Sequence, residues 1–177
     1  MLMMNSENRF GIVAILLHWI MAILLIGLVV MGLYMTNIHI SALKLKLYGW
    51  HKEYGILALM LVIVRICWRI TNKIPVLNIP KWEIIAARGM HWAFYGFMFA
   101  LPISGWLITS AAGLPVSFFG LFLLPNLVSA SEEHRVLFQE IHQWLGYGLI
   151  AAFCGHVGAA LKHHFINKDD ILRRMLS

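Results

Sequence analysis

Apolar residues gather in four long runs along this chain, separated by short segments that contain charged and turn-forming residues. A bilayer-crossing α-helix takes about 20 residues, and within lipid the backbone must satisfy its own hydrogen bonds, which favours helices. The predicted transmembrane helices cover about residues 12–34, 48–70, 89–110 and 141–163. Because no internal repeat or low-complexity segment divides the chain, we expect one all-α membrane domain, residues 1–177, built as a four-helix bundle.

Basic residues are unevenly distributed between the two ends of this predicted bundle. Lys and Arg are enriched in the cytoplasmic segments of membrane proteins. One end would hold Arg9, Arg65, Arg69, Lys73, Lys81, Arg88, Lys162, Lys168, Arg173 and Arg174. The other end would hold Lys44, Lys46, Lys52 and Arg135, together with Glu132, Glu133 and Glu140. This asymmetry predicts that both termini lie in the cytoplasm.

The composition supports a membrane protein and argues against two other classes. The 177 residues are 60% hydrophobic and 12% charged, whereas soluble domains are roughly 45–50% apolar. The net charge of +6 is located just outside the apolar runs, so we expect no nucleic-acid partner. Cys67 and Cys154 both lie within apolar runs, and no Cys-x-x-Cys-His motif occurs, so neither a disulfide framework nor covalent haem attachment is expected.

The long segment 111–140, between the third and fourth runs, divides into two parts. Its first part contains Gly113, Pro115, Gly120 and Pro125 and predicts a loop. Its second part reads SASEEHRVLFQEIHQW, which is typical of a capped helix start that leads into the fourth span.

Nine histidines are the most unusual feature of so apolar a chain, since ionisable residues inside a membrane usually have a function. His142 and His156 are 14 residues apart on one predicted helix, which separates them by about 21 Å on the same face. His18 matches His156 in depth, and His51 matches His142. The sequence therefore predicts two histidine pairs between helices, one near each membrane surface.

Two facing imidazoles in the core of a bundle are typical axial ligands of haem iron. Zinc is disfavoured, because it takes four ligands and no carboxylate lies in the middle of these helices. Small residues follow three of these histidines by four positions and share their helix faces, namely Gly55, Gly146 and Ala160. Two alternatives stay open: a single histidine can form a hydrogen bond between helices, and glycine is common in membrane helix packing.

His91 and His163 lie near the predicted cytoplasmic edge and are candidates for a quinone site. His163 is seven residues beyond His156 and so about 10 Å further along the same face. A polar group there could hydrogen-bond and protonate a quinone headgroup, but an interfacial histidine that faces water explains it as well. His91 also competes with His18 for the inner pair, and a haem propionate is a further partner for it.

Several longer segments resemble the bacterial cytochrome b561 family over essentially the whole chain. They are LLHW at 16–19, YGWHKEYG at 48–55, MHWAFYGFMFALPISGW at 90–106 and GHVGAALKHHFINKDDILRRM at 155–175, together with the spacing from His142 to His156. The resemblance implies a four-helix b-type cytochrome of the bacterial inner membrane with two haem b groups. It also implies haem ligation by His18, His51, His142 and His156, the four residues paired above by depth.

Within this family the chain looks like the superoxide oxidase type, which takes electrons from superoxide on the periplasmic side and passes them to ubiquinone. That activity is our leading hypothesis for the function. Lys44, Lys46, Lys52 and Arg135 would make the outer mouth basic and could steer a small anion, although lysines near a helix end are ordinary.

Two other hypotheses belong to different classes. Family members of similar shape serve as cytochrome subunits of hydrogenases and formate dehydrogenases, so the chain could be an anchor that passes electrons between a redox protein partner and quinone. A histidine-lined metal transporter is disfavoured, because broken helices and buried carboxylates are missing. We expect lipid, quinone and an electron donor as partners. The sequence does not decide between a monomer and a homodimer.

Overall fold

The computed structural model describes residues 3–7, 9–76 and 79–176. Four long helices dominate it: α1 (Ile12–Asn37), α2 (Ala42–Thr71), α3 (Lys81–Ala111) and α4 (Glu132–Leu161). By length and composition, all four are able to cross a membrane. The protein is therefore a multi-pass membrane protein with a four-helix, mainly α-helical architecture, as the apolar runs predict.

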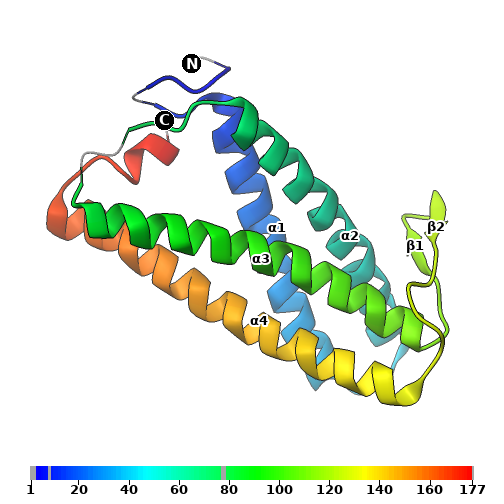
Figure 1. The fold of residues 1–177 in the computed structure, drawn as a ribbon. Coiled ribbons are helices and arrows are strands. Elements are labelled where there is room, and N and C mark those ends of the chain that lie inside the picture. Colours follow the sequence, from blue (N-terminus) through cyan, green and yellow to red (C-terminus); the bar gives the residue numbers. More distant parts are fainter. Residues whose placement is uncertain (1–2, 8, 77–78, 177) are drawn as a thin grey trace.

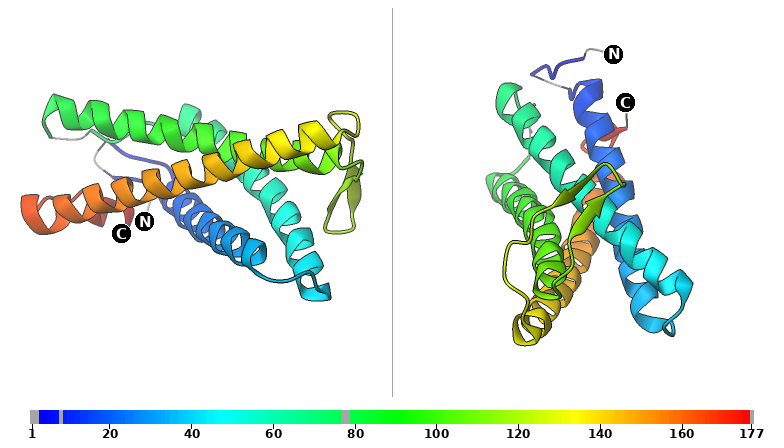
Figure 2. Two further views of the ribbon diagram at one scale, coloured as in Figure 1. Left: turned by 90° about the horizontal axis from the view of Figure 1, so that it is seen from below. Right: turned by 90° about the vertical axis from the view of Figure 1, so that its right-hand side faces the viewer.

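The helices pack in chain order, with α1 against α2, α2 against α3 and α3 against α4. The helices α3 and α4 run alongside each other, whereas α1 and α2 cross them obliquely (Figures 1 and 2). Met21, Val62, Tyr95 and Met98 form a buried cluster that joins α1, α2 and α3. The other large apolar side chains are mostly exposed, among them Ile23, Ile63 and Phe153, as expected for surfaces that face lipid.

Three helices begin well before the predicted spans. They start at Ala42, Lys81 and Glu132, rather than near residues 48, 89 and 141. Ser41 and Ser131 cap α2 and α4, because their hydroxyls accept hydrogen bonds from the backbone N–H of Lys44 and His134. The apolar runs indicated where a helix lies in lipid, and the caps show where it begins.

The loop predicted after residue 111 contains a β-hairpin of β1 (Val116–Phe118) and β2 (Phe122–Leu124), which an all-α class omits. The antiparallel register pairs Val116 with Leu124 and Phe118 with Phe122. Phe119 and Gly120 adopt positive φ angles of 50° and 72° at the turn. The Phe119 ring lies edge-on to Tyr54 of α2, with 5.3 Å between the ring centres, and this contact holds the hairpin against the bundle.

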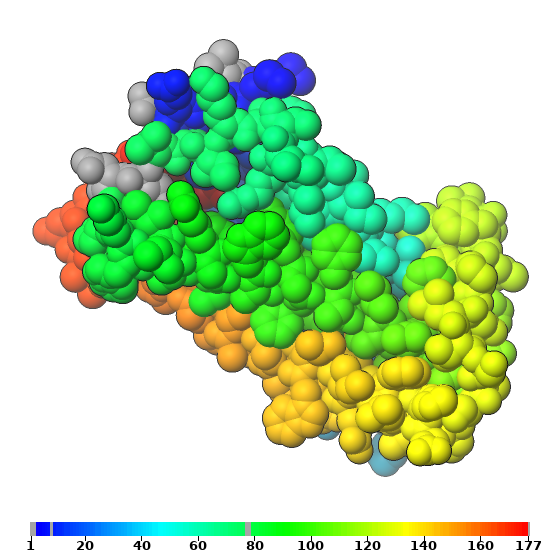
Figure 3. Space-filling view, viewed as in Figure 1, coloured from blue at the N-terminus to red at the C-terminus, as the bar shows by residue number. Residues whose placement is uncertain are grey.

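Both chain termini lie at the end of the bundle opposite the hairpin (Figures 1 and 3). Two short helices, η1 (Lys162–Asn167, a π-helix) and η2 (Arg173–Met175, a 3₁₀-helix), lead into the C-terminal tail. The indole of Trp19 donates to the Met175 carbonyl at 2.7 Å, and Arg174 donates to the Val76 carbonyl at 2.9 Å. These bonds tie the tail to α1 and to the segment that follows α2.

Candidate functional site

The helix α4 presents one histidine to α2 and another to α1. The ring centres of His51 and His142 are 6.1 Å apart, and those of His18 and His156 are 6.3 Å apart. All four side chains are half-buried. The structure therefore brings together the two pairs that were predicted from depth, one toward the hairpin end and one toward the end with the termini.

Both pairs have the geometry and chemistry that a haem requires. Two imidazoles with nitrogens each about 2 Å from a shared metal ion place their ring centres roughly 6 Å apart. The Nδ1 atom of His51 is buried and has no hydrogen-bond partner in the described part of the chain. Among the described residues, no group of three or more His, Cys, Asp or Glu is arranged to hold a metal ion. The donor set thus suits a metal whose other ligands come from a macrocycle.

Glycines define the space around the pair nearer the hairpin. A Cβ atom added at Gly32 or Gly105 would lie 3.4 Å from Cε1 of His51 or His142, respectively. Gly55 and Gly146, which the sequence analysis singled out, have no atom within 4 Å of such a Cβ. Thus α1 and α3 pack directly against the two imidazoles at Gly32 and Gly105, and open space remains beside each histidine one turn further along its helix.

Ser104 of α3 is a site residue that the sequence analysis missed. It is buried, and its Oγ lies 2.9 Å from Nδ1 of His142. The same Oγ donates to the backbone carbonyl of Leu101, also at 2.9 Å. A polar residue in an otherwise apolar stretch was the available signal, but the sequence did not indicate which helix its hydroxyl would face.

The pair nearer the termini has a different environment. A guanidinium nitrogen of Arg65 lies 3.2 Å from Nδ1 of His18. The His91 ring is 6.1 Å from that of His156, as close as the ring of His18. His91 is therefore a third imidazole at this site, and ring spacing alone does not separate it from His18 as the partner of His156.

A group of charged residues surrounds His163 where α4 passes into η1. Nδ1 of His163 lies 2.6 Å from Asp169, and Nε2 lies 3.9 Å from Glu83. Glu83 is only 9% exposed and also pairs with Lys162 at 3.0 Å. The sequence analysis singled out His163 but missed both of its acidic neighbours. Glu83 lies 80 positions earlier in the chain, and the contact with Asp169 depends on how the chain turns after α4.

The C-terminal tail beyond this group carries a second ion pair. Arg174 donates to Asp170 at 3.0 Å, and this hydrogen bond lowers the pKa of Asp170. The Asp170 carboxylate is exposed and remains charged at neutral pH, so this end of the molecule includes acidic as well as basic groups.

The four basic residues predicted at the outer mouth differ in their contacts. Lys44 donates to the Ile38 carbonyl at 2.8 Å, and the Lys46 ammonium lies 4.8 Å from the centre of the Trp50 ring. Together with Lys52, they occupy the first turns of α2, on the same helix as His51. Arg135, in contrast, forms an ion pair with Glu132 of its own helix, which offsets its charge.

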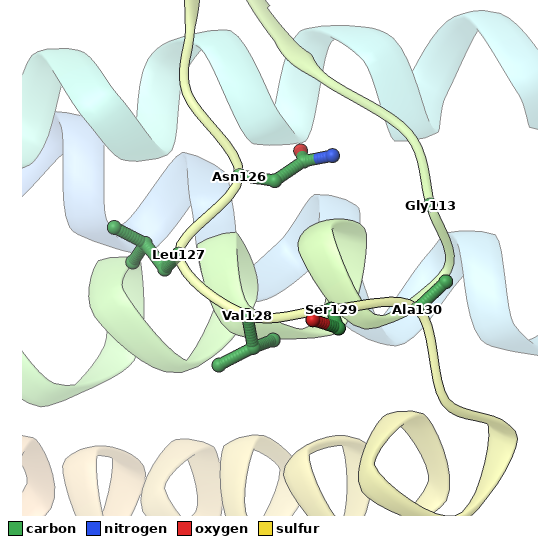
Figure 4. Close-up of a pocket in the computed structure, with 6 residues that line it drawn as sticks. All are labelled: Gly113, Asn126, Leu127, Val128, Ser129 and Ala130. Carbon is green, nitrogen blue, oxygen red and sulfur yellow. The ribbon is translucent and has the colours of Figure 1, made fainter.

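A surface depression of about 460 Å³ lies beside the loop that follows the hairpin, lined by Gly113, Asn126, Leu127, Val128, Ser129 and Ala130. Figure 4 shows the Asn126 side chain pointing toward the strand of loop that carries Gly113. No titratable side chain lines it, so it supplies no acid–base or ligand chemistry of its own.

Comparisons with known proteins identify a family and several relatives. The family model described as prokaryotic cytochrome b561 matches residues 9–177. Cytochrome b561 homolog 2 of Escherichia coli (strain K12) is 35% identical over 97% of this chain and 93% of its own length. Cytochrome b561 homolog 1 of the same organism is 34% identical, over 96% and 97%. The probable superoxide oxidase CybB of Yersinia pestis is 27% identical, over 96% and 97%.

The family match covers nearly all of the chain, two relatives exceed 30% identity, and the family implies haem b. The chain belongs to the prokaryotic cytochrome b561 family.

Proposed function

We propose that this membrane cytochrome holds two haem b groups and transfers electrons from superoxide, at the periplasmic side of the bacterial inner membrane, to ubiquinone. The observation that carries this proposal is that α4 contributes one histidine to each of two pairs, in which the ring centres are 6.1 and 6.3 Å apart. In the proposed orientation the pair nearer the hairpin faces the periplasm, and both termini are cytoplasmic. The similarity to a probable superoxide oxidase supports the choice of donor.

The proposed reaction balances with two protons as the only further reactant. Two superoxide anions each give up one electron and become O₂, and ubiquinone takes up two electrons and two protons to become ubiquinol. Haem b, when bound, supplies the reversible one-electron chemistry of its iron. The chain must therefore hold the haems, admit a small anion at one end, and provide protons at the other.

We assign these tasks to residues as follows. His51 with His142, and His18 with His156, are the axial ligands. Half-burial of the four imidazoles limits the access of water to the ligand bonds. The cation of Arg65, 3.2 Å from His18, suits a haem propionate. These assignments explain why charged and polar groups persist inside otherwise apolar helices.

His163 and His91 are the proposed contacts of ubiquinone. Asp169 accepts a hydrogen bond from Nδ1 of His163 and so orients this ring, and Glu83 lies on its other side. An imidazole held in place by neighbouring carboxylates suits a hydrogen-bond contact with a quinone headgroup. His91 extends the same side of the bundle toward His156.

A first experiment tests the whole proposal. The protein is purified in detergent, its haem content and reduced-minus-oxidised spectrum are recorded, and superoxide is added without oxygen, followed by ubiquinone. We expect two b-type haems per chain, reduced by superoxide and reoxidised by ubiquinone. A protein without haem would contradict the histidine assignment, and haems that do not respond to superoxide would contradict the donor.

One observation favours a second candidate function, that of a cytochrome subunit for a separate redox protein. The hairpin exposes Leu121, Phe122 and Leu123 at the proposed periplasmic end, and an exposed apolar tip is a suitable contact for a protein partner. Reduction of the haems by a periplasmic dehydrogenase or soluble cytochrome, but not by superoxide, would support this role.

A further inference from the structure

The two histidine pairs differ in the polar group that lies beside Nδ1 of one member of each pair. At His142 the Nδ1 atom meets the hydroxyl of Ser104 at 2.9 Å. At His18 the Nδ1 atom meets the guanidinium of Arg65 at 3.2 Å. A serine hydroxyl is neutral, whereas a guanidinium carries a permanent positive charge. The polar neighbours of the two pairs therefore differ in charge.

The contacts of Ser104 determine where the proton of His142 lies. A serine hydroxyl has one hydrogen, and the Leu101 carbonyl, 2.9 Å from Oγ, can only accept it. Toward His142 the oxygen must therefore act as an acceptor, so Nδ1 of His142 carries the ring proton. The lone pair on Nε2 is left free for a metal ion, and the hydrogen bond holds the ring in one orientation.

This hydrogen bond has a consequence for the metal. A ligating histidine that donates its other N–H to an oxygen becomes a more basic ligand, and a more basic ligand favours the ferric state. A nearby positive charge such as that of Arg65 favours the reduced state, because reduction removes one positive charge from the iron. The two environments therefore act on the reduction potential in opposite directions.

We propose that Ser104 is a positioning residue for His142 and that it gives the haem held by His51 and His142 the lower reduction potential of the two. The inference rests on the proposed haem ligation. The haem beside Arg65 then has the higher potential, so electrons that enter near the hairpin move downhill toward the end with the termini. Residues of the helices thus determine the direction of electron transfer.

The test compares Ser104→Thr with Ser104→Val in the purified holoprotein. The two replacements have nearly the same shape, and only threonine keeps the hydroxyl. A redox titration followed by absorbance, with soluble mediators, resolves the two haems. We expect Ser104→Thr to titrate like the native protein. In Ser104→Val we expect the reduction potential of the lower-potential haem to rise. The expected change is about tenfold in its reduction equilibrium, which for one electron is about 59 mV. The potential of the other haem should not change.

Two further variants make the result specific. Ser110→Ala removes another buried hydroxyl of α3, which accepts from the backbone N–H of Leu127 at 3.1 Å, and it should leave both potentials unchanged. Arg65→Gln removes the cation beside His18 and should lower the higher-potential component, which assigns the two components to the two ends. Loss of one haem in Ser104→Val, with both retained in Ser104→Thr, would also support the positioning role.

Other outcomes would overturn the inference. They are identical titrations of Ser104→Val and Ser104→Thr, a shift of the higher-potential component by Ser104→Val, or a lowering of the lower-potential component by Arg65→Gln. Because the titration uses neither superoxide nor ubiquinone, it gives its answer whether or not the proposed donor and acceptor are right. A holoprotein with unchanged potentials and full superoxide activity would refute the role of Ser104 alone.

Discussion

Six of the nine histidines in this chain fall into two groups by their surroundings. His18, His51, His142 and His156 are half-buried and face one another in pairs, whereas His39 and His134 are exposed in the segments outside the membrane helices or at the start of α4. Removing water from an imidazole without giving it a partner costs free energy. This cost is clearest at His51, whose buried Nδ1 has no hydrogen-bond partner among the described residues, and a bound ligand would offset it.

Replacement of one paired histidine should remove one haem and leave the other. We expect His142→Ala and His156→Ala each to bind about half the native amount of haem, because each pair loses one of its two axial ligands. Haem content per chain, measured on purified protein, checks this result. His39→Ala and His134→Ala are the controls and should keep the full content; a native haem content in His142→Ala would argue against its role as a ligand.

The sequence predicted those site residues that share one face of a single helix. The 14-residue interval between His142 and His156 is a multiple of the helical turn, so their common face could be inferred. Ser104 and Glu83 could not be found in this way, because their partners lie on another helix and depend on how α3 rotates against α4. His91 was expected at the membrane edge, shallower than His156. In the structure α3 already begins at Lys81, and the ring of His91 lies 6.1 Å from that of His156.

At the level of the helices, the contact between α3 and α4 depends on the small size of Gly148. A Cβ atom at this position would lie 2.9 Å from Cε1 and Cζ of the Phe97 ring. In membranes small residues let helices approach closely, and this approach brings Ser104 within reach of His142. The apolar runs predicted that the helices exist, but the ends of the helices and the hairpin depend on caps and on contacts such as Tyr54 with Phe119.

A methyl group at Gly148 should therefore separate the two helices. We expect Gly148→Ala to lower the Tm of the detergent-solubilised protein, because added atoms in a packed contact cost about 1–3 kcal/mol. Gly158→Ala is the matched control on the same helix, since its Cβ would meet nothing within 4 Å. Thermal unfolding of both variants checks the expectation, and equal Tm values would show that the contact tolerates the extra atom.

Across the whole molecule, the charges are arranged by end rather than by face. Lys44, Lys46 and Lys52 lie in α2 at the end with the hairpin, near the first histidine pair, and Glu132, Glu133 and Glu140 lie in the part of α4 at that same end. The opposite end combines basic groups with Glu83, Asp169 and Asp170 around the chain termini. Such an arrangement suits an anion at one end and proton exchange at the other.

A triple substitution of Lys44, Lys46 and Lys52 to Gln should slow the reduction of haem by superoxide. A positive mouth raises the encounter rate of a small anion, and we expect a loss of about tenfold at low ionic strength that shrinks as salt is added. Arg135→Gln should have much less effect, because Glu132 already offsets that charge. Stopped-flow absorbance at two salt concentrations measures both, and an unchanged rate in the triple variant would rule out steering.

The share of α4 in both histidine pairs also has a consequence for the assembly of the protein in the cell. In chain order α4 follows the other three described membrane helices, and it supplies His142 and His156, so neither proposed site is complete before α4 has been made. We therefore expect haem to bind after the first three helices have entered the membrane. When haem is scarce, we expect an inserted apoprotein in which both proposed sites are empty.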